Sequence, residues 1–129
     1  MLRSTLAALS VCTILGLAPP VHAGLKFNTP VSVDPAARRG LGALGSARAS
    51  ADAIQYIYCY AVHGVSASAF CVARDAASTT VSCFTTDPAK VAIVSAMTSS
   101  SYVYFDYDAS GTCVNLLVEN ASYYPPVVP

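Results

Sequence analysis

Residues 59–83 read CYAVHGVSASAFCVARDAASTTVSC, which places three cysteines twelve residues apart. Between them lie β-branched and aromatic residues, interrupted by the turn-forming stretches 63–66 and 75–78. The spacing therefore predicts two successive antiparallel hairpins that align the cysteines of neighbouring strands. A fourth cysteine, Cys113, lies thirty residues further along the chain.

The first 23 residues have the composition of a secretory signal peptide. A positive charge at Arg3 precedes an apolar run over residues 6–18, and Val21-His22-Ala23 offers small residues at the positions that a signal peptidase reads. The run is shorter than the roughly 20 residues of a membrane span. We therefore expect an exported protein, periplasmic or secreted, with no transmembrane segment in the mature chain.

In such a compartment the four mature cysteines are expected to form two disulfides. Opposed strand residues have Cβ atoms about 4.5–5.5 Å apart, which a disulfide bridges after modest adjustment. We favour Cys71–Cys83 with Cys59–Cys113, and the pairing of Cys59–Cys71 with Cys83–Cys113 stays open. A zinc site is disfavoured because C-x-x-C pairs are missing.

Residues 24–50 differ in composition from the rest of the mature chain. Four basic residues face a single acid, and the stretch has little apolar periodicity. We expect a flexible basic arm. Its Gly40-Leu41-Gly42-Ala43-Leu44-Gly45 matches the letters of a dinucleotide-binding loop, but no strand is predicted before it. We expect no cofactor, and the acidic remainder of the chain argues against nucleic acid as a partner.

Residues 51–129 are predicted to form a disulfide-braced α+β domain. Asp87-Pro88 is a helix start, and Val91, Val94 and Met97 give that helix an apolar stripe. The predicted architecture is a small five-stranded, antiparallel-rich sheet in the order β-β-β-α-β-β, with the helix on one face. The expected strands cover residues 54–62, 69–74, 80–85, 101–107 and 112–119.

Alternation along these strands assigns two faces to the sheet. All four cysteines are expected on one face, together with Tyr102, Tyr104 and Asn115. We expect the helix to pack on the other face, which would carry Ile54, Tyr56, Tyr58, Tyr60, Val62, Phe70, Val72, Phe84, Val103, Phe105, Val114, Leu116 and Val118. The hairpin turn at 108–111 sets Val103 opposite Leu116 and Phe105 opposite Val114.

Two groups of tyrosines are candidates for binding. Tyr56, Tyr58 and Tyr60 suit either a stacking platform for sugars or bases or core packing, and the assigned face favours the core. Tyr102 and Tyr104, beside Asn115, are the better candidate binding face. The tail at 121–126 is an alternative cover for that face.

Catalytic and metal signatures are weak. His63, the single histidine after the signal peptide, would need Asp106 or Asp75 beside it to act as the base of a small secreted hydrolase. Asp106-x-Asp108-x-Ser110-Gly111 resembles half of a calcium loop but lacks the glutamate at its twelfth position, so a hairpin turn explains it better.

Several short motifs match a known group. These are Gln55-Tyr56-Ile57-x-Cys59, Cys71-x-Ala73-Arg74-Asp75, Ser82-Cys83, Asp87-Pro88, Ser101-Tyr102, Asp108-x-Ser110-Gly111-x-Cys113, Val118-x-Asn120 and Ser122-x-Tyr124. Over the cysteine domain the chain resembles a group of small exported bacterial four-cysteine proteins of unassigned function. The resemblance implies a shared fold and an envelope or extracellular setting, and it carries over no active-site residues.

The function hypothesis is therefore a non-enzymatic binding module. Its partner would be a protein, peptide or glycan of the cell envelope. A small hydrolase using His63 is the alternative.

Overall fold

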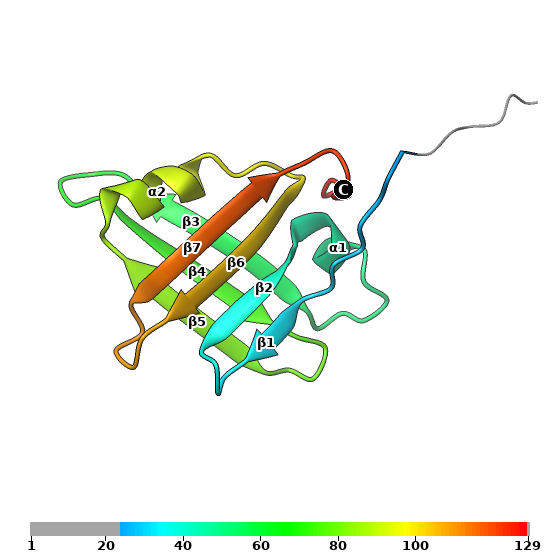
Figure 1. The fold of residues 1–129 in the computed structure, drawn as a ribbon, viewed down its shortest axis with the longest axis horizontal. Coiled ribbons are helices and arrows are strands. Elements are labelled where there is room, and N and C mark those ends of the chain that lie inside the picture. Colours follow the sequence, from blue (N-terminus) through cyan, green and yellow to red (C-terminus); the bar gives the residue numbers. More distant parts are fainter. Residues whose placement is uncertain (1–23, 129) are drawn as a thin grey trace, which may run out of the picture.

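The computed structural model describes residues 24–128, and the predicted signal peptide, residues 1–23, lies outside them. Two antiparallel sheets pack face to face, and their strands cross in Figure 1. Sheet A has the order β1 (Ser32–Asp34), β2 (Arg39–Ala43), β6 (Ser101–Tyr107) and β7 (Cys113–Asn120). Sheet B has the order β3 (Tyr56–Val62), β4 (Ser68–Arg74) and β5 (Thr80–Thr85). All five predicted strands exist, but they are divided between two sheets instead of forming one.

The prediction of a flexible arm over residues 24–50 is wrong. This segment supplies β1, β2 and the short helix α1 (Leu44–Arg48), and β2 pairs with β6 inside sheet A. A Cβ on Gly40 would lie 2.7 Å from the Cβ of Ala73 and 2.9 Å from Cζ of Phe105. Gly40 thus lets β2 approach sheet B closely, a use of a small residue that gives no hydrophobic periodicity to detect.

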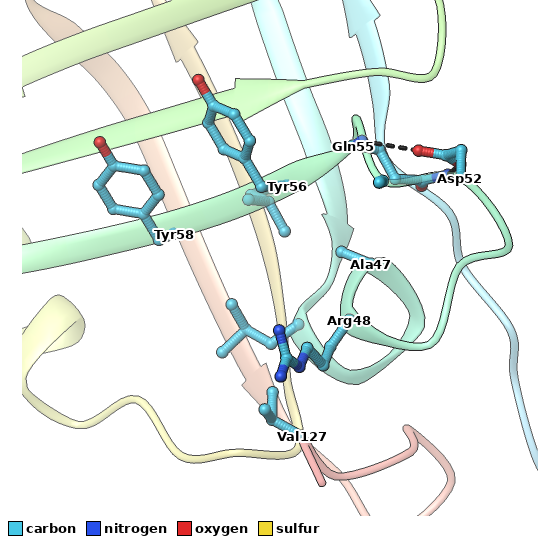
Figure 2. Close-up of a pocket in the computed structure, with 10 residues that line it drawn as sticks. Ala47, Arg48, Asp52, Gln55, Tyr56, Tyr58 and Val127 are labelled. Carbon is cyan, nitrogen blue, oxygen red and sulfur yellow. Dashed lines mark hydrogen bonds between the residues drawn. The ribbon is translucent and has the colours of Figure 1, made fainter. Parts of the chain in front are cut away.

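Two helices close the ends of the sandwich. The predicted helix is confirmed as α2 (Pro88–Ser95), where the Asp87 side chain accepts a hydrogen bond from the Ala89 N–H at 2.9 Å and Val91 and Val94 are buried. Helix α1 packs against β3 and β6 (Figure 2). A Cβ on Gly45 would overlap the carbonyl oxygen of Pro125, so the C-terminal tail crosses α1 where only glycine fits.

The hairpins of sheet B form as the cysteine spacing predicts. Cys59 lies opposite Cys71, and Cys71 lies opposite Cys83. The turn between β4 and β5 is held by the Asp75 carboxylate, which accepts a hydrogen bond from the Thr79 N–H at 2.9 Å.

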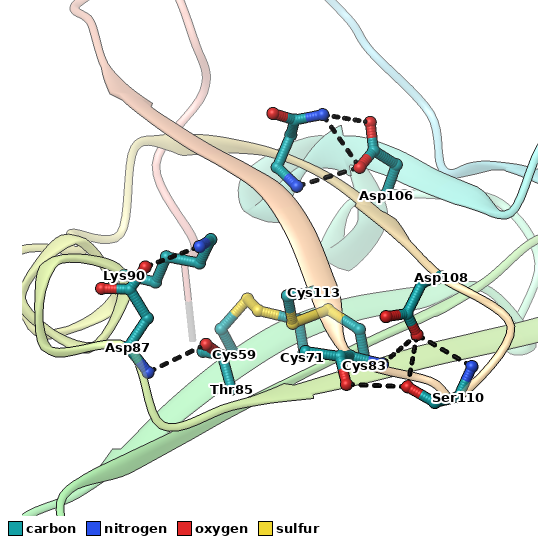
Figure 3. Close-up of a disulfide and its surroundings, with 12 residues drawn as sticks. Cys59, Cys71, Cys83, Thr85, Asp87, Lys90, Asp106, Asp108, Ser110 and Cys113 are labelled. Atoms are coloured by element: carbon teal, nitrogen blue, oxygen red, sulfur yellow. Dashed lines mark hydrogen bonds and ion pairs between the residues drawn. A yellow bond between two sulfur atoms is a disulfide. The ribbon is translucent and has the colours of Figure 1, made fainter.

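The disulfides are Cys59–Cys71, within sheet B, and Cys83–Cys113, between the two sheets (Figure 3). The favoured pairing of Cys71 with Cys83 is therefore wrong, and the alternative is confirmed. The reason is that β7 belongs to sheet A and lies across β5, whereas the favoured pairing required β7 to lie beside β3. The Phe84 N–H also donates to the Gly111 carbonyl at 2.9 Å, which joins the sheets at the same corner.

The predicted face assignment is reversed in sheet B, whereas in sheet A Val103 and Phe105 are buried as predicted. The cysteine face of sheet B is the buried one, because sheet A covers it instead of solvent. On the opposite face, Tyr56, Tyr58 and Tyr60 are 38%, 43% and 51% exposed. The core between the sheets contains Val31, Ala47, Ile57, Ala69, Cys71, Ala73, Val81, Cys83, Val91, Val94, Val103, Phe105 and Cys113.

A bulge in the last hairpin explains why Cys113 joins this core. Phe105 lies opposite Leu116 instead of Val114, and a register shift after Asp106 sets Tyr107 opposite Cys113. The extra residue, Val114, is left exposed. The bulge therefore turns Cys113 to the same side as Phe105, which simple alternation around a four-residue turn does not anticipate.

Candidate functional site

The predicted binding face, Tyr102, Tyr104 and Asn115, lies on the outer side of sheet A. The ring of Tyr102 stacks on Tyr124 of the C-terminal tail, with centroids 5.5 Å apart and planes at 15°. The hydroxyls of Tyr123 and Tyr124 both donate to the Glu119 carboxylate. The tail therefore covers this part of the face, which the sequence left as one alternative.

Tyr104 and Asn115 are engaged by one carboxylate. The Tyr104 hydroxyl donates to Asp106 at 3.1 Å, and the side-chain amide of Asn115 donates to both Asp106 oxygens at 2.9 and 3.0 Å. Partial burial opposes ionisation of Asp106, but the hydrogen bonds from Asn115 and Tyr104 outweigh it and lower its pKa. Burial and the hydrogen bond to Asp106 raise the pKa of Tyr104. The polar groups of this face thus have partners within the chain.

The groups of the hydrolase hypothesis lie in separate hydrogen-bond networks. His63 Nε2 lies 2.9 Å from Ser95 Oγ, and that hydroxyl donates to the Val91 carbonyl at 2.9 Å. Asp75 holds its own turn, and Asp106 binds Tyr104 and Asn115. In the described part of the chain, His63 has no hydrogen bond to either aspartate. In a catalytic pair, the serine hydroxyl donates its hydrogen bond to the histidine that acts as base. The Ser95 hydroxyl donates to a backbone carbonyl instead, so His63 does not hold it as a base would.

The Asp108 loop forms a hairpin turn. The Asp108 carboxylate accepts from the Ser110 N–H at 2.8 Å and from the Thr112 N–H at 3.0 Å (Figure 3). Hydrogen bonds from the Ser110 hydroxyl and the Thr112 N–H lower the pKa of Asp108. Within residues 24–128 no group of three or more His, Cys, Asp or Glu residues is arranged to hold a metal ion.

The outer side of sheet B is different, because a row of aromatic rings lies open there. Tyr56 and Tyr58 have ring centroids 5.9 Å apart, and Tyr58 and Tyr60 have centroids 6.4 Å apart. Phe70 on β4 extends the row at 5.8 Å from Tyr60, and Phe84 on β5 is 48% exposed beside it. We call these five residues the aromatic row.

Strand β3, which carries most of the row, is an edge of sheet B. Its residue Cys59 has a Cα 4.1 Å from that of Cys71, close to the roughly 4.5 Å of a non-hydrogen-bonded pair. By the antiparallel alternation, the backbone N–H and C=O groups of Ile57, Cys59 and Ala61 point away from β4. No hydrogen bond to these groups occurs among residues 24–128. We call this side of β3 the free edge.

Helices α1 and α2 both pack against β3. The strand itself lacks the features that interrupt the other sheet edges of the described chain. Strand β1 has three residues, β5 is closed by its bridge at Phe84, and β7 has a bulge and carries Glu119. Strand β3 has the sequence YIYCYAV, with neither charge nor proline over seven residues. Natural proteins block such edges because they pair with other strands. The uncharged edge of β3 is therefore a candidate for pairing with another strand.

A groove of about 500 Å³ runs along the start of the free edge, within the roughly 300–1,000 Å³ range of ligand sites. It lies between β3, α1 and the C-terminal tail (Figure 2). Tyr56 and Tyr58 contribute to its lining, while Figure 2 shows their rings pointing away from α1. The groove is lined by Leu44, Ala47, Arg48, Asp52, Ala53, Gln55, Tyr56, Ile57, Tyr58 and Val127.

One end of the groove is fixed by Asp52 and Gln55. The Asp52 carboxylate accepts from the backbone N–H groups of Ile54 and Gln55 at 2.9 and 2.8 Å and also from the Gln55 side chain. These bonds, those of Gln55 first, lower the pKa of Asp52 to about 2. The side-chain carbonyl of Gln55 accepts from the Val31 N–H at 3.0 Å, so the loop before β3 is tied to the N-terminal segment.

The tail forms another wall of the groove. The Val127 N–H donates to the Ser99 carbonyl at 2.9 Å, and the Phe27 N–H donates to the Tyr123 carbonyl at 2.8 Å. The tail is thereby hydrogen bonded both to the segment before β6 and to the N-terminal segment.

Comparisons with protein-family models, with curated proteins and with solved structures found no match. Of the helices in residues 24–128, none is both long and apolar enough to cross a lipid bilayer. The site must therefore be interpreted from its own geometry. Sequence reasoning missed the free edge and the groove, although the charge-free run from Tyr56 to Val62 was a signal that could have drawn attention to them.

Proposed function

We propose that the protein is an exported, non-enzymatic module that binds an extended peptide segment of another envelope protein. The segment adds as a strand to the free edge of β3 and fills the groove beside α1. The observation that carries this proposal is the coincidence of the groove with the free edge. Chains that bind in this way gain affinity from main-chain hydrogen bonds and specificity from pockets for alternate side chains.

An added strand fits the backbone of β3, and its side chains fit both the groove and the face that carries the tyrosines. An added strand lies about 4.8 Å from β3 and hydrogen bonds to the N–H and C=O groups of Ile57 and Cys59. Its side chains alternate between two directions. One set enters the groove between Ile57 and α1, and the other set lies beside Tyr56 and Tyr58, where cross-strand aromatic contacts are favourable.

The site is also fixed before binding. The Cys59–Cys71 disulfide holds β3 to β4, and the Asp52 hydrogen bonds hold the loop that precedes β3. A site that is already ordered loses less conformational entropy when a peptide binds.

The proposal is tested by titrating the ¹⁵N-labelled mature protein with synthetic octapeptides that are randomised at seven positions and end in leucine. We expect chemical-shift changes at the amides of Ile57, Cys59 and Ala47. Leu44→Glu, which places a charge in the groove, should abolish them. Val65→Glu is the matched control, since Val65 is fully exposed in the loop after β3. Changes centred on Tyr102 and Asn115, or none at all, would contradict the proposal.

A further inference from the structure

We infer that the bound segment is a chain terminus: its C-terminal carboxylate pairs with Arg48, and its last side chain, an apolar one, occupies the groove. This inference rests on the proposed addition of a strand to β3. It assigns to the site a ligand class, peptides with a free carboxylate after an apolar residue.

Arg48 is the cation that lines the groove. It is the last residue of α1, it is exposed, and Figure 2 shows its guanidinium beside Val127. Elsewhere in the described chain, Arg39 pairs with Asp34 at 3.3 Å and Lys90 pairs with Asp87 at 2.7 Å. Among residues 24–128 the Arg48 side chain has neither an ion pair nor a hydrogen bond. Its planar fork of donors matches a carboxylate with two parallel hydrogen bonds.

The acidic residue of the groove does not neutralise Arg48. The Asp52 carboxylate is occupied by donors from Ile54 and Gln55, and Figure 2 shows it on the side of the groove away from Arg48. The two charges give the groove a positive and a negative end. A carboxylate is therefore favoured at Arg48 and repelled at Asp52.

The alternation of an added strand separates a chain terminus from an acidic side chain. Side chains that enter the groove meet the apolar groups of Leu44, Ile57 and Val127, where an Asp or Glu would lose hydration. Side chains on the other face would lie beside Tyr56, whose ring Figure 2 shows on the side of β3 away from Arg48. A terminal carboxylate continues the backbone between β3 and α1, so it reaches Arg48 while the last side chain fills the apolar part.

The test compares matched peptides. Individual octapeptides are picked from the randomised set by their affinity for the wild-type protein. The tightest binders are resynthesised with a free carboxylate, with a C-terminal amide, and as an amide with aspartate in place of the last leucine. We expect the wild-type protein to bind the free acid at least ten-fold more tightly than either amide, equal to about 1.4 kcal/mol. Arg48→Gln should reduce this preference to less than two-fold. Lys26→Gln, an exposed basic residue outside the groove, should retain it.

The outcomes separate the two proposals. If acid and amide bind equally to the wild-type protein at Ile57 and Cys59, the carboxylate inference is wrong and strand addition stands. If the aspartate amide binds as tightly as the free acid, an acidic side chain is the ligand and the chain-terminus inference is wrong. If no octapeptide shifts the amides of β3, both proposals fail.

Discussion

Both outer faces of the sandwich carry tyrosines, but the tyrosines of the two faces differ in the contacts that their side chains make. On sheet A, Tyr102 stacks on Tyr124, and the tail hydroxyls bind Glu119, so the chain covers its own aromatic surface. On sheet B, Tyr58 contacts Tyr56 and Tyr60 within the aromatic row and is 43% exposed. The difference teaches that residue type alone does not mark a binding face; the two faces are separated by whether the C-terminal tail covers the rings.

The same contrast holds for the sheet edges. The edge of sheet A at β7 is interrupted by a bulge, whereas the edge of sheet B at β3 continues uncharged into a groove. The three tyrosines of the aromatic row and the free edge thus lie on the same strand, β3. Substitutions in each region test whether the covered face serves stability and the open one serves binding.

The largest loss of stability is expected when the disulfide between the two sheets is removed. Replacing Cys83 and Cys113 with alanine should lower the free energy of unfolding by about 2–5 kcal/mol. Replacing Cys59 and Cys71 should cost about 0.8 kcal/mol less, because their loop of 12 residues is shorter than the loop of 30. Denaturant unfolding of both variants checks the order. A larger loss for the Cys59–Cys71 pair would show that the link between the sheets is not the main brace.

Releasing the tail from the covered face should have the next largest effect. In Gly45→Ala the new Cβ overlaps the Pro125 carbonyl oxygen, so the tail must move, at a cost of about 1–3 kcal/mol. Thermal unfolding and solvent accessibility of the Tyr124 ring measure this. Gly64→Ala is the matched control, since no atom lies within 4 Å of its added Cβ. Equal stability of the two variants would contradict the packing of the tail on α1.

Single tyrosine replacements should separate the two faces directly. Tyr102→Ala should cost about 1–2 kcal/mol of stability, since it removes the stacking partner of Tyr124. Peptide binding should be unchanged in this variant. Tyr58→Ala should cost about 0.5 kcal/mol and weaken binding of the octapeptides several-fold. Unfolding and titration of both variants are required. The reverse pattern would place the binding surface on sheet A.

The smallest effect is expected in strongly alkaline solution. Burial raises the pKa of Tyr102 and of Tyr124 above the ordinary value of 10.0, with the charge of Glu119 contributing to both. Above pH 10 the unfolded chain loses these protons first, so the free energy of unfolding should fall as the pH rises. Glu119→Gln should lessen this fall, whereas Asp34→Asn should not. A free energy of unfolding that is constant or rises above pH 10 would contradict the covered environment of these rings.

The sequence was sufficient for local structure. Hairpins follow from the twelve-residue cysteine spacing, and α2 follows from Asp87-Pro88 and its apolar stripe, because both signals depend on neighbours in the chain. The division into two sheets was not predictable in the same way. On β3 both faces are apolar, with Ile57 and Ala61 on one side and tyrosines on the other, so alternation alone did not identify the buried one.

The remaining errors have definite causes. Glycine and alanine in β2 fill the core without a periodic signal, and the bulge beside Val114 changes the parity of Cys113. The groove joins Leu44, Ile57 and Val127, which are far apart in the chain. Neither the groove nor the exposure of the aromatic row exists until the sheets have packed, so residue patterns alone do not specify them.

Amide hydrogen exchange at the free edge of β3 tests the central claim most directly. In the protein alone, the N–H groups of Ile57 and Cys59 should exchange faster than those of Tyr58 and Tyr60, which face β4. With the tightest octapeptide bound, exchange at Ile57 and Cys59 should slow at least ten-fold. Protection of these two amides without peptide, or no change when peptide binds, would contradict strand addition at β3.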